Sequence, residues 1–347
     1  MFDALLLMSF GGPERPEDVM PFLRNVTRGR GVPDARLEAV AEHYSHYGGV
    51  SPINEQNRRL LAAIEADYAA HGIDVKLYWG NRNWDPYVED TMERMRTDGV
   101  QRAAAFVTSA YGGYSACRQY LEDIARARAA VGEGAPQIVK LPQYAHRGGF
   151  IAPHAEAVKR CLDTIATARQ ASTRVLYSAH SIPTAMDRGS GPGGGLYSTQ
   201  LRRAAQLVTQ RLDADVSWEL VWQSRSGSSS VPWLEPDIND RLRELPSEGV
   251  TDVVVSPIGF VSDHVEVLWD LDEEAATTAK EAGLGYMRAS TPGTDPRFVG
   301  LVRELFLETA RQDENGDIVA DMAHSMGAIS ELEGRCQTGC CSLVRSR

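Results

Sequence analysis

The stretch Arg174-Val-Leu-Tyr-Ser-Ala-His180-Ser-Ile-Pro183 decides the fold. Its apolar, β-favouring residues give way to small and hydroxyl residues, a histidine and a proline, which is typical of a buried strand that runs into a turn. A second run, Val253–Val255, leads in the same way to the block Gly259-Phe-Val-Ser-Asp-His264-Val-Glu266-Val-Leu-Trp-Asp270. Helical patterns follow each run, so we expect parallel strands joined by helices. Both blocks would then lie at the carboxyl edge of a sheet, where ligands bind in open α/β folds.

The rest of the chain repeats this alternation. Strands are expected at Ala4–Met8, Val75–Trp79, Ala103–Val107, Ile138–Leu141, Arg174–Tyr177, Val216–Trp222, Val253–Val255 and Tyr286–Arg288. Helices are expected at Pro16–Val26, Arg36–Tyr47, Asn54–Ala70, Pro86–Met95, Ser115–Ala130, Pro153–Ala166, Ser198–Leu212, Asp263–Glu281 and Asp295–Arg311. Ala103–Gly113 and Asp252–Phe260 echo each other, since both are apolar strands that run into glycine and an aromatic residue. We therefore predict two similar doubly wound, Rossmann-like domains with parallel sheets and a cleft between them. Their expected ranges are 1–146 and 147–312, followed by a tail at 313–347.

Composition limits the class of protein. At 347 residues the chain is longer than one typical core, and its 43% hydrophobic and 24% charged residues are ordinary for a globular protein. The apolar start of the chain is too short and lacks the basic flank of a signal peptide, so it is expected to be a buried first strand. The net charge of −11 argues against nucleic acid and against docking on an anionic membrane. These features predict a soluble cytoplasmic protein without stable membrane insertion, in a reducing compartment where cysteines are free or bind metal.

The histidines differ in their expected roles. A lone histidine is more often structural than catalytic, and His46, His71, His154 and His324 are given that interpretation. His180 differs because it lies at a strand end between small or hydroxyl residues and ahead of Pro183, which favours exposure to a cleft. A neutral imidazole there can accept a proton or bind a divalent metal. His264 neighbours several acids, and its expected role is to orient one of them.

Three carboxylates are spaced at i, i+4 and i+8: Glu266, Asp270 and Glu274. On a helix this spacing aligns them along one face. A solvated helix face is the usual meaning of such a pattern. Here the row begins among apolar residues, and like charges at this spacing destabilise a helix unless a cation visits. Oxygen ligands of this kind suit a partly hydrated divalent ion.

One glycine-rich segment is set aside. Gly189–Gly194 matches the letters GxGxxG, but a dinucleotide-binding turn needs these glycines directly between a strand and a helix. This run follows a loop and contains Pro192, so we interpret it as a flexible loop beside the cleft. A nicotinamide-dependent enzyme remains a distant alternative.

Together these blocks resemble the ferrochelatases, which insert ferrous iron into a porphyrin. The resemblance extends from Ser9 to Leu271 and includes further segments: Ser9-Phe-Gly-Gly-Pro13, Tyr47-Gly-Gly-Val-Ser-Pro-Ile-Asn54, Val221-Trp-Gln-Ser-Arg225 and Pro232-Trp-Leu234. It implies the chelatase fold, with two Rossmann-like domains around a cleft. It also implies that His180 and Glu266 accept protons and bind the iron, with Asp270 and Glu274 as a path for the metal.

Contacts to the porphyrin follow from the same resemblance. The matching positions are Phe10, Arg28, Ser51 and Tyr120. Some relatives that metallate coproporphyrin have a tyrosine where this chain has Phe10, so an axial phenolate contact is not available here. The register of Arg28 is open, because Thr27 or His43 could occupy the propionate-binding positions instead.

The cysteines gather near the end of the chain, at Cys336, Cys340 and Cys341. Some ferrochelatases hold a [2Fe–2S] cluster with three tail cysteines and one from the body of the protein. The resemblance therefore implies such a cluster here, with Cys161 as the fourth ligand and Cys117 as the reserve. The tail spacing departs from the family pattern, and zinc on the same four thiolates is the alternative.

The predicted function is insertion of ferrous iron into coproporphyrin III in heme synthesis. The segment Gly12–Asp18 is charged where membrane-associated protoporphyrin enzymes have an apolar lip, which favours the substrate with more carboxylates. The alternatives are a protoporphyrin IX ferrochelatase, another tetrapyrrole chelatase and, more distantly, a binding protein without catalysis. The expected partners are the porphyrin and ferrous iron, with the preceding and following enzymes of heme synthesis as further candidates.

Overall fold

The structure is a computed structural model that describes residues 2–213, 215–226, 230–314, 340 and 341. Within these residues, short apolar runs form two four-stranded sheets in which all pairs are parallel. The first sheet contains β1 Ala4–Ser9, β2 Lys76–Asn81, β3 Arg102–Val107 and β4 Gln137–Lys140. The second contains β5 Thr173–His180, β6 Ser217–Gln223, β7 Asp252–Ser256 and β8 Gly285–Arg288.

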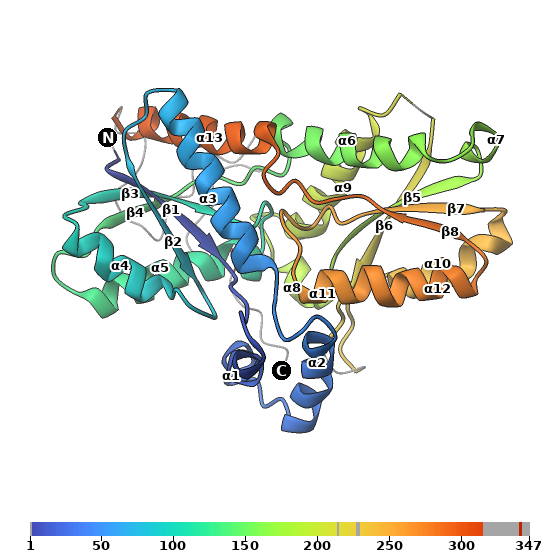
Figure 1. The fold of residues 1–347 in the computed structure, drawn as a ribbon, viewed down its shortest axis with the longest axis horizontal. Helices are drawn as coiled ribbons and strands as arrows, with labels where there is room; N and C mark the ends of the chain where they lie inside the picture. The colour runs from blue at the N-terminus through green and yellow to red at the C-terminus, as the bar shows by residue number, and fades with distance from the viewer. Residues whose placement is uncertain (1, 214, 227–229, 315–339, 342–347) are drawn as a thin grey trace.

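The two sheets have the same strand order. It is β2-β1-β3-β4 in the first and β6-β5-β7-β8 in the second. The strands β3 and β7, whose sequences echo each other, therefore occupy equivalent positions. The prediction of two doubly wound parallel sheets is confirmed, and the sheets lie beside each other in Figure 1.

Helices cover both faces of each sheet, as buried parallel strands require. The longer ones are α2 Asp34–His46, α3 Ile53–Ala70, α4 Val88–Thr97, α5 Gln119–Val131, α6 Gly148–Asp163, α9 Leu196–Thr209 and α13 Pro296–Glu314. The shorter ones are α1 Val19–Val26, α7 Thr167–Gln170, α8 Thr184–Arg188, α10 Ile238–Glu244, α11 Val265–Leu268 and α12 Ala276–Glu281. Two π-helical turns, η2 Tyr114–Arg118 and η4 Trp269–Ala275, interrupt the α-helical segments. None of the described helices is both long and apolar enough to cross a membrane.

One apolar core runs through both halves. It contains side chains from the α3 face of the first sheet and from the α6 and α9 face of the second. Two smaller cores fill the opposite faces, one beneath α4 and α5 and one beneath α10 and α12. The division at residues 146 and 312 stays a prediction, since the helices of this shared core come from both ranges.

The helix α13 belongs to the second half of the sequence but packs on the first. Its Phe306 ring lies 5.7 Å from Phe2 and 5.4 Å from Tyr68, measured between centroids. Figure 1 shows α13 crossing α3 above the first sheet. The close contact of α13 with α6 depends on Gly149, because a Cβ there would lie 2.5 Å from the Arg297 carbonyl oxygen. The helix α6 begins at Gly148 rather than at Pro153, where the sequence predicted its start, and Gly149 in its first turn is the residue that packs on α13.

The helices α1 and α2 lie below both sheets in Figure 1. They enclose a small core of their own, in which Phe22 and Tyr44 contact Val265 of α11. Since α11 belongs to the second half, this segment joins the two halves beside the carboxyl ends of the strands. The expected cleft lies at that edge.

Candidate active site

His180 is the last residue of β5 and pairs with Gln223 at the end of β6. Its side chain is partly exposed, as predicted from the turn residues around it. Nδ1 lies 2.5 Å from the carbonyl oxygen of Ser181, which can only accept, so Nδ1 carries the proton in this contact. Nε2 therefore keeps its lone pair in the neutral ring, which is the form that can accept a proton or bind a metal.

The three spaced carboxylates, called the acidic row below, lie where α11 continues into the π-helical turn η4. Glu266 and Asp270 are partly buried and Glu274 is exposed, so the row leads from solvent towards the interior. The sequence predicted a long helix over Asp263–Glu281, and the structure has helix from Val265 to Glu281 with this π turn inside it. The π turn widens the helix within that range, and such turns are frequent at functional sites.

Asp270 is the most perturbed member of the acidic row. Burial raises the pKa of its carboxyl to about 7; Glu266 and Glu274 add to the rise, while hydrogen bonds from Ser224 and Gln223 oppose it. Ser224 has a positive φ of 62°, which is strained for a residue with a side chain. The turn after β6 is therefore shaped so that a hydroxyl meets this carboxylate.

His264 directly precedes α11, and both His180 and Glu266 affect its pKa. Burial lowers its pKa; Glu266 raises it and His180 lowers it, so both side chains lie within electrostatic reach of the imidazole. Its ring packs edge-on against Phe260 at 5.3 Å between centroids. His180 at the end of β5, and His264 and Glu266 in the segment after β7, therefore lie at the carboxyl edge of the second sheet, with His180 and Glu266 within electrostatic reach of the His264 ring.

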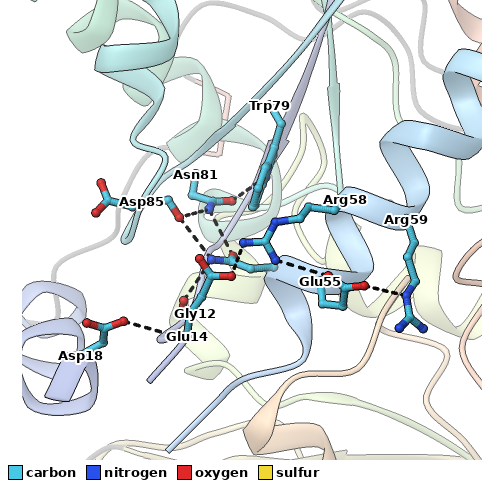
Figure 2. Close-up of polar contacts among 10 residues, drawn as sticks. Gly12, Glu14, Asp18, Glu55, Arg58, Arg59, Trp79, Asn81 and Asp85 are labelled. Carbon is cyan, nitrogen blue, oxygen red and sulfur yellow. Dashed lines mark hydrogen bonds and ion pairs between the residues drawn. The ribbon is translucent and has the colours of Figure 1, made fainter. Parts of the chain in front are cut away.

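The loop after β1 lies at the carboxyl edge of the first sheet, and Figure 2 shows the contacts that fix it. Asn54 Nδ2 donates to the carbonyl oxygen of Gly12 at 3.2 Å, and Asn81 Nδ2 donates to Asn54 Oδ1 at 3.2 Å. The Arg58 guanidinium reaches forward from α3 to the carboxylate of Glu14 (Figure 2). The charged lip predicted from the sequence is therefore tied to α3 by amide and ion-pair contacts.

The four predicted porphyrin contacts lie around the same loop, with different exposure. Phe10 is 38% exposed and its ring meets Phe22 edge-on at 6.2 Å. Arg28 follows α1 and is exposed. Ser51 and Tyr120 are buried, which sequence alone did not indicate. Burial raises the pKa of Tyr120, and the Arg82 guanidinium, 4.0 Å above its ring, opposes that rise.

Comparison with known proteins decides the family. The family model described as Ferrochelatase matches residues 2–310. The chain belongs to the ferrochelatase family. A protein named coproporphyrin III ferrochelatase from Nocardia farcinica is 53% identical over 347 residues, covering 99% of this chain and 97% of that one. One of the same name from Mycolicibacterium smegmatis is 54% identical over 307 residues, covering 88% and 89%.

Solved structures of lower identity share the fold. SirB from Bacillus subtilis, solved with Fe3+, superposes with a TM-score of 0.54 at 14% identity and covers 91% of this chain and 98% of its own. A complex of the sirohydrochlorin chelatase SirB with cobalt gives 0.52 at 16% identity, covering 91% and 98%. The chelatase fold expected of a ferrochelatase is therefore confirmed.

The cysteines of this ferrochelatase are only partly placed. Cys340 and Cys341 are described, with 3.5 Å between their sulfur atoms, whereas Cys336 lies outside the described residues. Burial raises the pKa of the Cys341 thiol to about 12, and Cys340 and Cys117 add to the rise. Gly191 N donates to Cys341 Sγ at 3.2 Å, which joins tail and body. Cys117, the residue held in reserve, lies within electrostatic reach of Cys341, whereas nothing described links the preferred Cys161 to the tail. Among the described residues, no group of three or more histidines, cysteines and acids is arranged to hold a metal.

The glycine-rich segment borders a cavity of about 540 Å³ lined also by His146, Leu196 and Arg203. The first amides of α9 are already occupied, since Tyr197 N donates to Ser190 Oγ and Ser198 N to Asp187 Oδ1. These contacts agree with the interpretation of the segment as a loop rather than a phosphate-binding turn.

Sequence reasoning gave no role to several side chains beside the acidic row: Gln56, Gln223, Ser224, Trp269 and Arg288. Arg288 pairs with Asp263 at 3.0 Å and Asp272 at 2.6 Å. Because Arg288 is the last residue of β8, and the carboxyl ends of the strands hold the site, its pairing with acids of the site could have been predicted. The contacts of Gln56 and Trp269 cross between the halves and have no local signal.

Proposed function

We propose that this ferrochelatase inserts ferrous iron into coproporphyrin III to give Fe-coproporphyrin III in heme synthesis. The observation that supports the proposal is the position of His180 at the end of β5 and of His264 and Glu266 in the segment after β7, at the carboxyl edge of one sheet. A proton acceptor and a carboxylate are the two groups that porphyrin metallation requires. The relatives named coproporphyrin III ferrochelatase, at about half of all positions identical, support the substrate.

The chemistry replaces two pyrrole N–H protons with one Fe²⁺, so two protons must leave the ring for each metal that enters. His180 Nε2 accepts a pyrrole proton, and the partly buried Glu266 supplies negative charge and an oxygen ligand to the iron. Asp270, with a pKa of about 7, can hold either a proton or a cation near neutrality. The acidic row thus serves both the incoming metal and the outgoing protons.

The preference for coproporphyrin is supported by the lip of the site. Glu14, Arg15 and Glu17 are exposed there, and Arg28 extends into solvent nearby. Coproporphyrin carries four propionates, whereas protoporphyrin carries two propionates and apolar vinyl groups. The exposed Arg28 can donate charge-assisted hydrogen bonds to a propionate, which favours the substrate with more carboxylates.

The test is an anaerobic assay of ferrous insertion with coproporphyrin III and protoporphyrin IX side by side, in one detergent-free buffer. We expect a clear preference in kcat/KM for coproporphyrin III. A preference for protoporphyrin IX would overturn the substrate and leave the reaction standing. Insertion of another metal only would favour a different tetrapyrrole chelatase, and binding without turnover would favour a non-catalytic porphyrin or metal carrier.

The iron–sulfur cluster remains a proposal about the tail, and the described cysteines do not by themselves form its ligand set. The nearness of Cys117 to Cys341 supports Cys117, together with Cys336, Cys340 and Cys341, as the thiols to test. Protein made with ample iron and sulfide and handled without air should show a brown visible spectrum, which Cys336→Ser abolishes. Colourless protein that contains zinc would favour the zinc alternative, and metal-free protein would reject both.

We also propose that the enzyme works in the cytoplasm and exchanges porphyrins with the enzymes that precede and follow it. The absence of a spanning helix in the described residues agrees with this location. Fractionation of cells followed by immunoblotting tests it.

A further inference from the structure

The π-helical turn brings Trp269 and Glu274 into contact. The indole Nε1 donates to Glu274 Oε1 at 2.9 Å. In an α-helix a residue five positions ahead lies about 140° away around the axis, so this pair would point apart. The i→i+5 spacing of the π turn removes most of that offset. The contact therefore depends on the π turn at Trp269–Ala275.

The indole is also held from the other half of the molecule. The ring of His43, on α2, stacks on Trp269 with 4.0 Å between centroids and 9° between planes. His46, one turn further along α2, meets the same indole edge-on at 5.6 Å. Trp269 is thus fixed by rings from α2 on the side opposite to its own helix.

The carboxylates around Trp269 fall into two groups, those that contact a basic side chain and those that do not. Asp263 and Asp272 pair with Arg288, and Glu273 pairs with His46 at 3.2 Å. Among the described residues, no arginine, lysine or histidine forms an ion pair with Glu266, Asp270 or Glu274. Asp263 and Asp272, off the row, thus share an arginine, whereas the described part of the chain gives the three carboxylates of the row no ion-pair partner.

The Trp269 contact fits this division. An indole N–H is a neutral donor, so it can fix the orientation of the Glu274 carboxylate without cancelling its charge. An arginine in its place would occupy the carboxylate and compete with a metal. A carboxylate held in one orientation at the exposed end of the row suits capture of a divalent cation from solvent.

We propose that Trp269 is a positioning residue for iron uptake, and that its indole, clamped by His43, orients Glu274 to receive the ferrous ion. This inference rests on the proposed function of the acidic row as the path of the metal. It adds Trp269, which orients a carboxylate of the row, and His43, which stacks on the indole.

Trp269→Phe tests the proposal, because it keeps an aromatic ring for His43 and removes only the N–H donor. We expect KM for Fe²⁺ to rise about fivefold, which is ~1 kcal/mol at about 1.4 kcal/mol per tenfold. The KM for coproporphyrin and kcat at saturating iron should stay within about twofold. Trp218→Phe is the matched control, since Trp218 packs on Tyr177 in the second sheet and should leave every constant unchanged.

A binding measurement without porphyrin separates this inference from the enzyme's activity. Mn²⁺ prefers carboxylate over thiolate ligands, so its binding, followed by electron paramagnetic resonance of the free ion, reports on the row rather than the cysteines. Trp269→Phe and Glu274→Gln should each weaken Mn²⁺ binding, and the double variant should be no weaker than Glu274→Gln alone.

The clamp is tested by His43→Ala, which should raise the Mn²⁺ dissociation constant and the KM for Fe²⁺ together, and by His43→Phe, which should restore both. The inference is overturned if Trp269→Phe changes neither constant, if the effects of Trp269→Phe and Glu274→Gln add, or if the porphyrin KM rises instead. Absence of ferrous insertion by the wild-type protein would reject the proposed function, while the Mn²⁺ data would still decide the role of Trp269.

Discussion

The side-chain amide of Gln56 makes two hydrogen bonds to the backbone of Asp263. Nε2 donates to the carbonyl oxygen at 3.2 Å, and the backbone N–H donates to Oε1 at 2.9 Å. Gln56 lies on α3 in the first half, and Asp263 immediately precedes the segment that carries His264 and the acidic row. The placement of the metal-handling residues of one half therefore depends on a side chain of the other.

His180→Ala should abolish metallation and leave most of the porphyrin binding intact. The variant loses the Nε2 lone pair at the end of β5, whereas the strand itself is held by its neighbours. Porphyrin binding can be followed by absorbance and ferrous insertion by an anaerobic assay. Insertion at near wild-type rate would show that the proton acceptor lies elsewhere.

Glu266→Gln keeps the size of the side chain and removes its charge. We expect kcat to fall by orders of magnitude and porphyrin affinity to change much less, since the lost interaction is with the metal and the departing protons. Equal losses of turnover and porphyrin binding would instead indicate a structural role. Asp270→Asn and Glu274→Gln should have smaller effects and mainly raise the iron concentration required.

The pKa of Asp270 predicts a pH dependence. Its carboxyl, with a pKa of about 7, is neutral below that pH and charged above it, so kcat/KM for Fe²⁺ should rise as the pH passes through about 7. Asp270→Asn should flatten this limb of the profile. Because the pKa of Asp270 is higher in the folded protein than in the unfolded chain, the free energy of unfolding falls as the pH rises from about 4 to about 7 and stays lower above 7. Asp270→Asn removes this loss, so the variant should be harder to unfold at pH 8 than the wild type. An unchanged profile would exclude Asp270 as the titrating group.

His154 predicts loss of stability in acid. It is fully buried on α6, neither ring nitrogen has a partner, and burial lowers its pKa to about 3. The unfolded chain takes up this proton below about pH 6.5, so folding should lose ~2 kcal/mol by pH 5 from this group. His154→Leu should remove that loss. Urea unfolding of the two proteins at pH 8 and pH 5 measures it, and an equal decline in both would exclude His154 as the cause.

The sheets were predictable because each strand is a short apolar run bounded by turn residues. His180 and Glu266 were predictable for a related reason, since parallel strands place their carboxyl ends at one edge. The π turn was not, because over seven residues an apolar pattern does not distinguish its period from that of an α-helix. The start of α6 was missed because glycine has a low helix propensity, whereas the packing of Gly149 on α13 involves residues far away in sequence.

The cysteines and the porphyrin contacts show a second limit. The spacing of the cysteines could not show whether Cys161 or Cys117 is the fourth ligand of the proposed cluster. That depends on which part of the folded protein the tail contacts. Ser51 and Tyr120 are buried by the packing of the loop after β1 and of α5, and that packing involves distant segments. Residue type and position along a strand can be predicted locally, whereas the partner of a side chain across the cleft cannot.

The packing of α13 on the first sheet has a consequence for synthesis. Phe2 and Tyr68 are made early by the ribosome, but Phe306, which covers them, is made more than two hundred residues later. The first half therefore cannot close its core while it is being translated and must wait with an uncovered apolar face. A nascent chain stalled before α13 should accordingly expose this apolar face and bind a chaperone more readily than one that includes α13.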